Sequence, residues 1–104
     1  MAQRLHLTDL PERPLDAAAA FASRYLSQAR ASSAGDLVLL FAHADHTHEN
    51  WRRAAVEELA REAAPARVNG VVGGGAAAQG EVIDYLDRAP GVTGQVFVIA
   101  GATA

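Results

Sequence analysis

The chain contains no cysteine and no lysine, and each absence removes a class of chemistry. Without cysteine it has no disulfide framework and no thiolate nucleophile, and we expect a cytoplasmic location. All nine basic residues are arginine. Any mechanism that needs a lysine ammonium is therefore excluded, whatever the fold.

Long apolar runs and basic stretches are missing as well. The longest apolar run, residues 37–42, is far shorter than the roughly 20 residues that span a bilayer. Charged residues occupy the N-terminal segment, where a signal peptide would be apolar. The net charge is −3 and no segment is strongly basic. We therefore expect neither a membrane nor a nucleic acid as partner.

The residues that are present predict an α/β fold. Half of the 104 residues are apolar, which suits one small domain over residues 1–104. Largely apolar runs over 36–42, 67–72 and 95–100 predict parallel strands covered on both faces. Helices are expected over 15–31, 49–64 and from 76 or 79 to 88. The result is a small three-layer, Rossmann-like half-fold with three parallel strands, and residues 4–10 are left open as a fourth.

Both of the first two predicted helices present apolar faces. Trp51, Ala55 and Leu59 repeat at helical spacing on one, and Phe21 and Tyr25 lie on the other. If residues 4–10 do not pair with the strand over 36–42, that strand leaves an open edge, and open edges recruit other chains. We therefore interpret these five residues as interface residues. The alternative is a monomer whose N-terminal segment covers the edge.

Two segments resemble the short-chain dehydrogenase/reductase family. The first is Arg-Val-Asn-Gly-Val-Val at 67–72, preceded by Leu-Ala-Arg-Glu at 59–62. The second is Thr-Gly-Gln followed by Val-Phe-Val-Ile-Ala at 93–100, after the helix that contains Val-Ile-Asp-Tyr-Leu. The resemblance covers residues 15–101. It implies the last strands of a doubly wound sheet, without the dinucleotide-binding first half.

The catalytic residues of that family do not carry over. The family uses a serine at the end of a strand, and a tyrosine with a lysine four residues later on the next helix. Here the strand ends in Ala-His-Ala-Asp at 42–45, and the helix begins Glu-Asn-Trp-Arg-Arg at 49–53. Tyr25 and Tyr85 lie on other predicted helices. The resemblance therefore implies a protein without reductase activity, and NAD(P) is not expected as a cofactor.

What the resemblance does carry over is assembly. Members of the family commonly dimerise through the helices that correspond to 15–31 and 49–64, and often tetramerise through the last helix and strand. We therefore expect a non-catalytic pseudoenzyme that forms a homo-oligomer, or a hetero-oligomer with a full-length relative, as a structural or stabilising subunit.

A histidine-rich segment provides the alternative function. His43, His46 and His48 fall within six residues, interleaved with Asp45 and Glu49, just after a predicted strand. Imidazoles and carboxylates are zinc ligands, so a small metal- or ligand-binding protein or enzyme could use this loop. The plainer interpretation is a polar loop with solvated histidines, in which Asp45 or Thr47 caps the helix. The adjacent Arg52-Arg53 pair is interpreted as a solvated face, and contacts of this pair with an anion are left open.

The glycine-rich loop at 73–75 is the other candidate. Gly73 and Gly75 fit Gly-x-Gly-x-x-Ala between a strand and a helix, the context in which backbone N–H groups bind a pyrophosphate. No acidic residue follows the next strand to hold a ribose. A flexible strand-to-helix turn is the plainer interpretation, and no cofactor is predicted.

Overall fold

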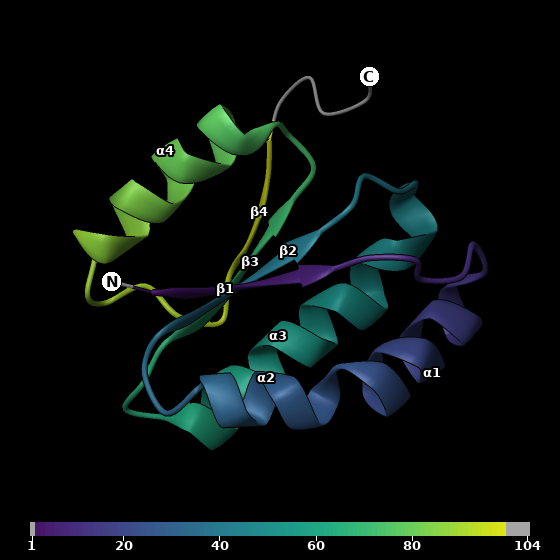
Figure 1. Ribbon diagram of the computed structural model, residues 1–104, viewed down its shortest axis with the longest axis horizontal. Coiled ribbons are helices and arrows are strands. Elements are labelled where there is room, and N and C mark those ends of the chain that lie inside the picture. Colours follow the sequence, from purple (N-terminus) through teal and green to yellow (C-terminus); the bar gives the residue numbers. More distant parts are fainter. Residues whose placement is uncertain (1, 100–104) are drawn as a thin grey trace.

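All three predicted strands form, and the N-terminal segment adds a fourth. The computed structural model describes residues 2–99, and Figure 1 shows their arrangement. The strands are β1 (Gln3–Leu7), β2 (Leu37–Phe41), β3 (Val68–Val72) and β4 (Val96–Val98). They lie in the order β1-β2-β3-β4, and every neighbouring pair is parallel. The α/β half-fold is confirmed. The predicted end of the last strand, Ala100, lies outside the described residues.

The helices match the predicted segments with one exception. They are α1 (Pro14–Arg24), α2 (Leu26–Ser32), α3 (Glu49–Ala63) and α4 (Ala76–Asp87), and a 3₁₀ turn, η1 (His46–His48), precedes α3. The single helix expected over 15–31 is wrong, because Tyr25 separates α1 from α2 with φ −119°. Its hydroxyl accepts the Thr8 N–H (3.1 Å) and donates to the Thr8 carbonyl (3.0 Å). This pair of bonds ties the helix break to the end of β1.

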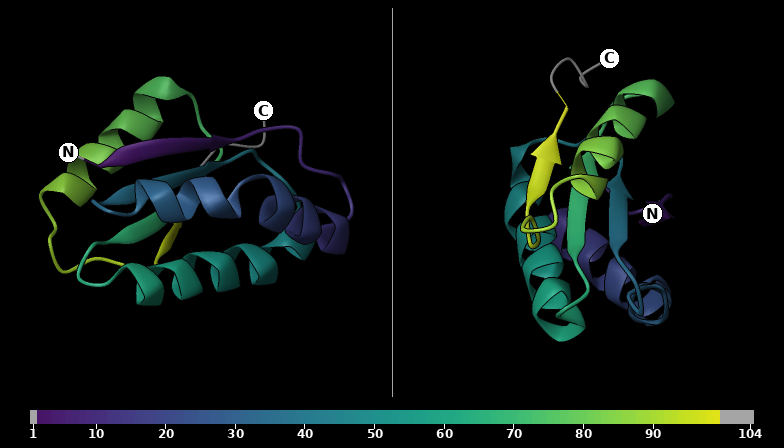
Figure 2. Two further views of the ribbon diagram at one scale, coloured as in Figure 1. Left: turned by 60° about the horizontal axis from the view of Figure 1, so that its bottom comes forward. Right: turned by 90° about the vertical axis from the view of Figure 1, so that its left-hand side faces the viewer.

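The helices divide unequally between the two faces of the sheet. In Figure 2, α1, α2 and α3 cover one face, whereas α4 covers the other. The larger core lies under the first three helices and includes Leu5, Leu39, Phe41, Val56 and Val68. A smaller core under α4 contains Val38, Leu40, Val71, Ile83 and Leu86. Within residues 2–99, no helix has the length and apolar character needed to cross a bilayer.

Strand β1 closes the edge that the sequence left open. Leu5 and Leu7 pair with Leu39 and Phe41 of β2 and are buried under the helices. Their neighbours along the strand, including His6, are exposed. This alternation is typical of a strand covered on one face only. The open edge that supported assembly is therefore not on β2, and the outer edges of the described sheet belong to β1 and β4.

The first residue of the family-like segment 67–72 links several elements of the fold. Arg67 donates to the Asp36 carboxylate (2.8 Å) and to the carbonyls of Leu86 (2.9 Å) and Ala89 (2.7 Å), so it joins the start of β2 to the end of α4. The backbone N–H of Arg67, together with its guanidinium, holds the pKa of Asp36 below its usual range. The resemblance at 67–72 therefore rests partly on a structural arginine.

Candidate functional site

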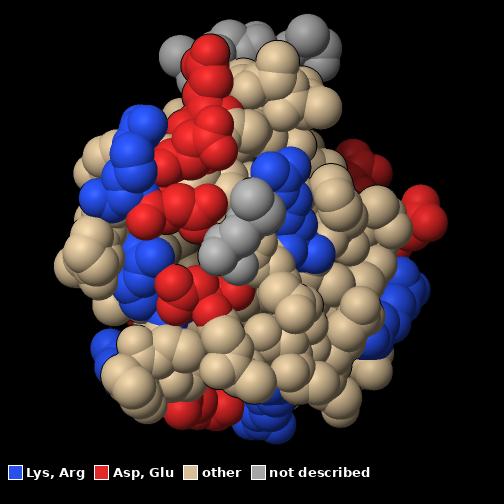
Figure 3. Space-filling model, turned by 60° about the vertical axis from the view of Figure 1, so that its left-hand side comes forward, with Lys and Arg blue, Asp and Glu red and all other residues tan. Residues whose placement is uncertain are grey.

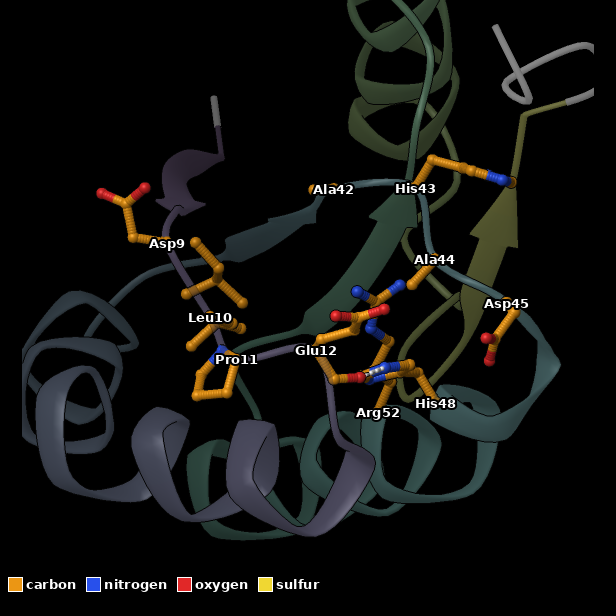
Figure 4. Close-up of a pocket in the computed structure, with 11 residues that line it drawn as sticks. Asp9, Leu10, Pro11, Glu12, Ala42, His43, Ala44, Asp45, His48 and Arg52 are labelled. Carbon is orange, nitrogen blue, oxygen red and sulfur yellow. Dashed lines mark hydrogen bonds between the residues drawn. The ribbon is translucent and has the colours of Figure 1, made fainter.

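A cleft opens where β1, β2 and β3 end. Ligands of open α/β sheets collect beyond the carboxyl ends of the strands, and two adjoining cavities lie there, of about 340 and 150 Å³. Both are lined by His43, Ala44, Asp45 and Arg52. The larger, drawn in Figure 4, is completed by the loop after β1, and the smaller by valines of β3 and β4.

Asp45 organises the turn between β2 and α3. It is the N-cap of η1, and its carboxylate accepts the backbone N–H of Thr47 (2.9 Å) and also the hydroxyl of that residue. These hydrogen bonds lower the pKa of Asp45. We expected Asp45 or Thr47 to cap the helix over 49–64, whereas Asp45 caps the 3₁₀ turn η1, and the N-cap of α3 is His48, without a side-chain cap. His43 and His46, the first two histidines of the loop, are exposed.

His48 is not the solvated histidine that we expected. It is 5% exposed, and both ring nitrogens have partners inside the chain. Trp51 Nε1 is 2.9 Å from Nδ1 and can only donate, so Nδ1 accepts. The other nitrogen, Nε2, therefore carries the proton and donates to the Glu12 carbonyl at 2.9 Å. His48 is a neutral positioning residue that holds the loop after β1 against the start of α3.

The predicted zinc ligands are consequently divided between two environments. The ring of His48 is engaged by Trp51 and Glu12, whereas His43 and His46 face solvent. Within the described part of the chain, no three His, Cys, Asp or Glu side chains are grouped closely enough to hold a metal ion. A zinc site on these histidines would require His48 to give up a hydrogen bond.

Arg52 is the residue of the cleft whose burial the sequence did not predict. The pair Arg52-Arg53 was interpreted as a solvated face, and this is wrong for Arg52, which is only 6% exposed; Arg53 is exposed. The guanidinium carbon of Arg52 lies 4.9 Å from the centre of the Phe41 ring and 5.8 Å from that of Trp51. Burial lowers the pKa of this guanidinium. The available signal was the spacing, since Val56, four residues later, is a core residue of the same helix.

The polar contacts of Arg52 are few. Its Nε is buried without a hydrogen-bond partner. The ion pairs between described residues are Arg30–Glu62, Arg61–Glu58 and Arg67–Asp36, and Arg52 takes part in none of them. Figure 4 shows its guanidinium extending from α3 toward the strand ends, between Glu12 and Ala44 in this view. The cleft thus contains a buried cation whose charge no described residue neutralises at ion-pair distance.

The glycine loop has a structural explanation. The N–H of Gly73 donates to the Phe41 carbonyl (2.9 Å), and the Gln79 side-chain amide donates to the carbonyls of Gly73 (3.1 Å) and Gly74 (3.3 Å). Gly73 and Gly74 have positive φ, and Gly75 is the N-cap of α4. The loop between β3 and α4 thus uses the Gly73 N–H and the first two carbonyls for its own hydrogen bonds.

The five proposed interface residues lie largely inside the chain. Phe21 and Leu59 belong to the core, and Trp51, Tyr25 and Ala55 are partly buried against it. The Trp51 ring centre lies 5.8 Å from that of Phe21 and 5.9 Å from that of Phe41. Any contact between subunits on these helices would therefore be formed mainly by their exposed neighbours.

Comparison with known families identifies the lineage of this half-fold. Residues 5–99 match the family described as short chain dehydrogenase-like protein. The chain belongs to this family. Searches of curated proteins and of solved structures gave no match. Serine, tyrosine and lysine, the residue types that catalyse reduction in the short-chain dehydrogenase/reductase family, are absent from the residues that line the two cavities.

Proposed function

We propose that this short-chain dehydrogenase-like protein is non-catalytic and acts as a structural subunit in an oligomer. The proposed lack of catalysis is supported by the composition of the cleft. Its walls contain no hydroxyl that could act as the acid, and the chain has no lysine to lower the pKa of one. Tyr25 is bonded to Thr8, and Tyr85 lies on α4, on the opposite face of the sheet from α3.

The proposed assembly into an oligomer is supported by exposed apolar side chains on α4 and β4. Tyr85 is 48% exposed and Val98 is 66% exposed, and the ring of Tyr85 packs edge-on against Phe97 of β4. This is the helix and strand through which relatives often tetramerise. On the face in Figure 3, acidic side chains lie beside basic ones, which suits a protein partner better than a nucleic acid. A cytoplasmic location is part of the same proposal.

Light scattering after size-exclusion chromatography tests the assembly. We expect the purified protein to elute as an oligomer, and Tyr85→Glu combined with Val98→Glu to shift it toward the monomer. Leu15→Glu on α1, which is 85% exposed and distant from α4 in Figure 1, separates the two candidate surfaces: it should leave the oligomer intact, and a shift toward the monomer would place the interface on the α1 face instead. A wild-type monomer at every concentration would refute a homo-oligomer. Capture of a full-length relative from the native source would then support the hetero-oligomer, and its failure would reject the assembly.

Nicotinamide cofactors test the lack of catalysis. Titration of the protein with NADPH and NADH should give no saturable binding, because the first half of the family's dinucleotide site has no counterpart among the described residues. A carbonyl substrate panel should give no cofactor oxidation. A tight complex with either cofactor would contradict the proposal and would make the loop at Gly73–Gly75 the candidate binding site.

A small ligand-binding protein is the second candidate function. It is favoured by one observation, the buried Arg52 in the wall of both cavities. The zinc form of this candidate is tested by metal analysis after chelation and re-addition of zinc. Retained zinc that is lost in His43→Ala would support a metal site, and the absence of retained zinc and of a thermal shift would remove it.

A further inference from the structure

Arg52 is a charged group in a position that normally requires a partner. Burying an ionised side chain is unfavourable unless it is paired and hydrogen-bonded. Phe41 and Trp51 supply part of the compensation through their ring faces. They cannot accept the in-plane hydrogen bonds that a guanidinium donates, and Nε, which is closed to solvent, has no acceptor. A ligand in the cavities would bind the two terminal nitrogens of the guanidinium, which form no hydrogen bond with a described residue.

Glu12 is the protein group best placed to supply that acceptor. Its carboxylate lies beside the guanidinium in the view of Figure 4, but the two do not form an ion pair at 4.0 Å or less. Glu12 is an exposed residue, and its backbone carbonyl is already bonded to His48. The backbone is thus held in place while the carboxylate remains outside contact distance of Arg52.

The two cavities differ in how well they suit an anion. Asp9, Glu12 and Asp45 line the larger one, where Arg52 is the single arginine, so an added anion would be repelled. In the smaller one Arg52 and Arg53 offset Asp45 and Glu49. The smaller cavity is therefore the more favourable place for a negative group.

The rest of the smaller cavity is apolar. Val72, Val96 and Val98 form one wall, and Val98 is 66% exposed, so burying it is favourable. A volume of about 150 Å³ equals that of roughly five water molecules, at about 30 Å³ each, which is close to the volume of a carboxylic acid with about four or five carbons. A ligand that fits is thus short, with one polar end at Arg52 and an apolar end at the valines.

We propose that Arg52 binds a small organic monocarboxylate in this cavity, with the carboxylate on the guanidinium and a short branched or straight hydrocarbon tail against the three valines. The guanidinium matches a carboxylate with two parallel hydrogen bonds. A doubly charged phosphate is a poorer ligand here, because Asp45 and Glu49 lie in the same walls. The inference rests on the second candidate function, a small ligand-binding protein, and Val98 belongs both to this cavity and to the proposed subunit surface, so the ligand is tested by binding and not by oligomeric state.

Isovalerate and isovaleramide are matched probes, since they differ in charge but hardly in shape. The chain has one tryptophan, and Trp51 touches Arg52, so its fluorescence reports on the site. Isovalerate should change this fluorescence in a saturable manner and raise the melting temperature. Isovaleramide and inorganic phosphate at equal concentration should bind about tenfold more weakly or worse. Equal responses to acid and amide, or no saturable response to isovalerate, would overturn the proposal.

Two arginines of α3 provide the matched variants. Arg52→Met should remove the response to isovalerate, whereas Arg61→Met, at an exposed residue of the same helix outside this cavity, should keep it. An unchanged response in Arg52→Met would overturn the assignment, and so would an equal loss in both variants. If Arg52→Met does not fold, an NMR titration of the wild-type protein tests the site. Isovalerate should shift the ¹⁵N–¹H signal of the Arg52 Nε, and an unshifted signal would reject the site.

Discussion

Replacing Arg52 with methionine should make the protein more stable. The wild-type side chain is 6% exposed, has an unsatisfied Nε and forms no ion pair with a described residue. Methionine keeps the unbranched stem that packs between Phe41 and Trp51, and it removes the charge. A residue that is retained for binding at the expense of stability behaves in this way.

The magnitude follows from two opposing terms. An unsatisfied buried donor destabilises the folded state by about 1–3 kcal/mol. The contacts of the guanidinium carbon with Phe41 at 4.9 Å and Trp51 at 5.8 Å are lost in the variant, at about 0.5–1 kcal/mol each. Because the guanidinium is charged and its Nε is fully buried, the upper end of the first range applies, about 3 kcal/mol. Subtracting the roughly 1–2 kcal/mol of the two lost ring contacts leaves a net gain of about 1 kcal/mol, or roughly 4–8 °C in melting temperature for a domain of this size.

Urea unfolding followed by circular dichroism measures this difference. The control Arg53→Met changes an exposed arginine next in sequence and should stay within about 0.5 kcal/mol of the wild type. A destabilisation of about 1 kcal/mol or more in Arg52→Met would refute the reasoning and make Arg52 a structural residue. Glu12→Gln, alone and combined with Arg52→Met, identifies the partner in that case. A coupling energy of about 1 kcal/mol or more would assign Arg52 to Glu12.

Three further predictions concern the frame that holds the cleft. Arg67→Met should lower the free energy of unfolding by about 3 kcal/mol, because it removes the guanidinium from the Asp36 carboxylate and from the carbonyls of Leu86 and Ala89, while the backbone N–H of residue 67 still donates to Asp36. Arg61→Met, in an exposed ion pair, should change it by less than about 1 kcal/mol in the same urea assay. Gly74→Ala should lower the free energy of unfolding by about 1–2 kcal/mol, since φ is +78° and the new Cβ would lie 2.5 Å from a neighbouring side chain. Gly80→Ala, where the new Cβ on α4 meets open space, should raise the free energy of unfolding by about 0.5–1 kcal/mol. The pKa of Asp36 is depressed in the folded state, so the stability that its carboxylate contributes is complete above about pH 4 and is lost as the pH falls further. On acidification the wild type should therefore lose more stability than Asp36→Asn. Parallel pH profiles of the two proteins would contradict the role given to Asp36.

The strands and helices could be predicted because their signals are local. Residues 37–41 are uniformly apolar and form a strand buried on both faces, and 49–63 repeats its apolar residues at helical spacing. The break at Tyr25 could not be predicted in this way. It coincides with hydrogen bonds to Thr8, 17 residues away, which no local pattern encodes.

In the candidate site too, some features follow from local sequence and others only from the packing of distant segments. The sequence by itself determined that the chain offers no lysine and no thiol, and that a polar, histidine-containing loop with Asp45 or Thr47 as its cap follows the strand over 36–42. Only the tertiary structure decided which charges in that region are buried. His48 and Arg52 follow Asp45 by three and seven residues and look as polar as their neighbours. They become buried because the loop after β1 and the rings of Phe41 and Trp51 close over them. Burial depends on what other segments place around a side chain, and that information lies in the packing of the sheet against α3.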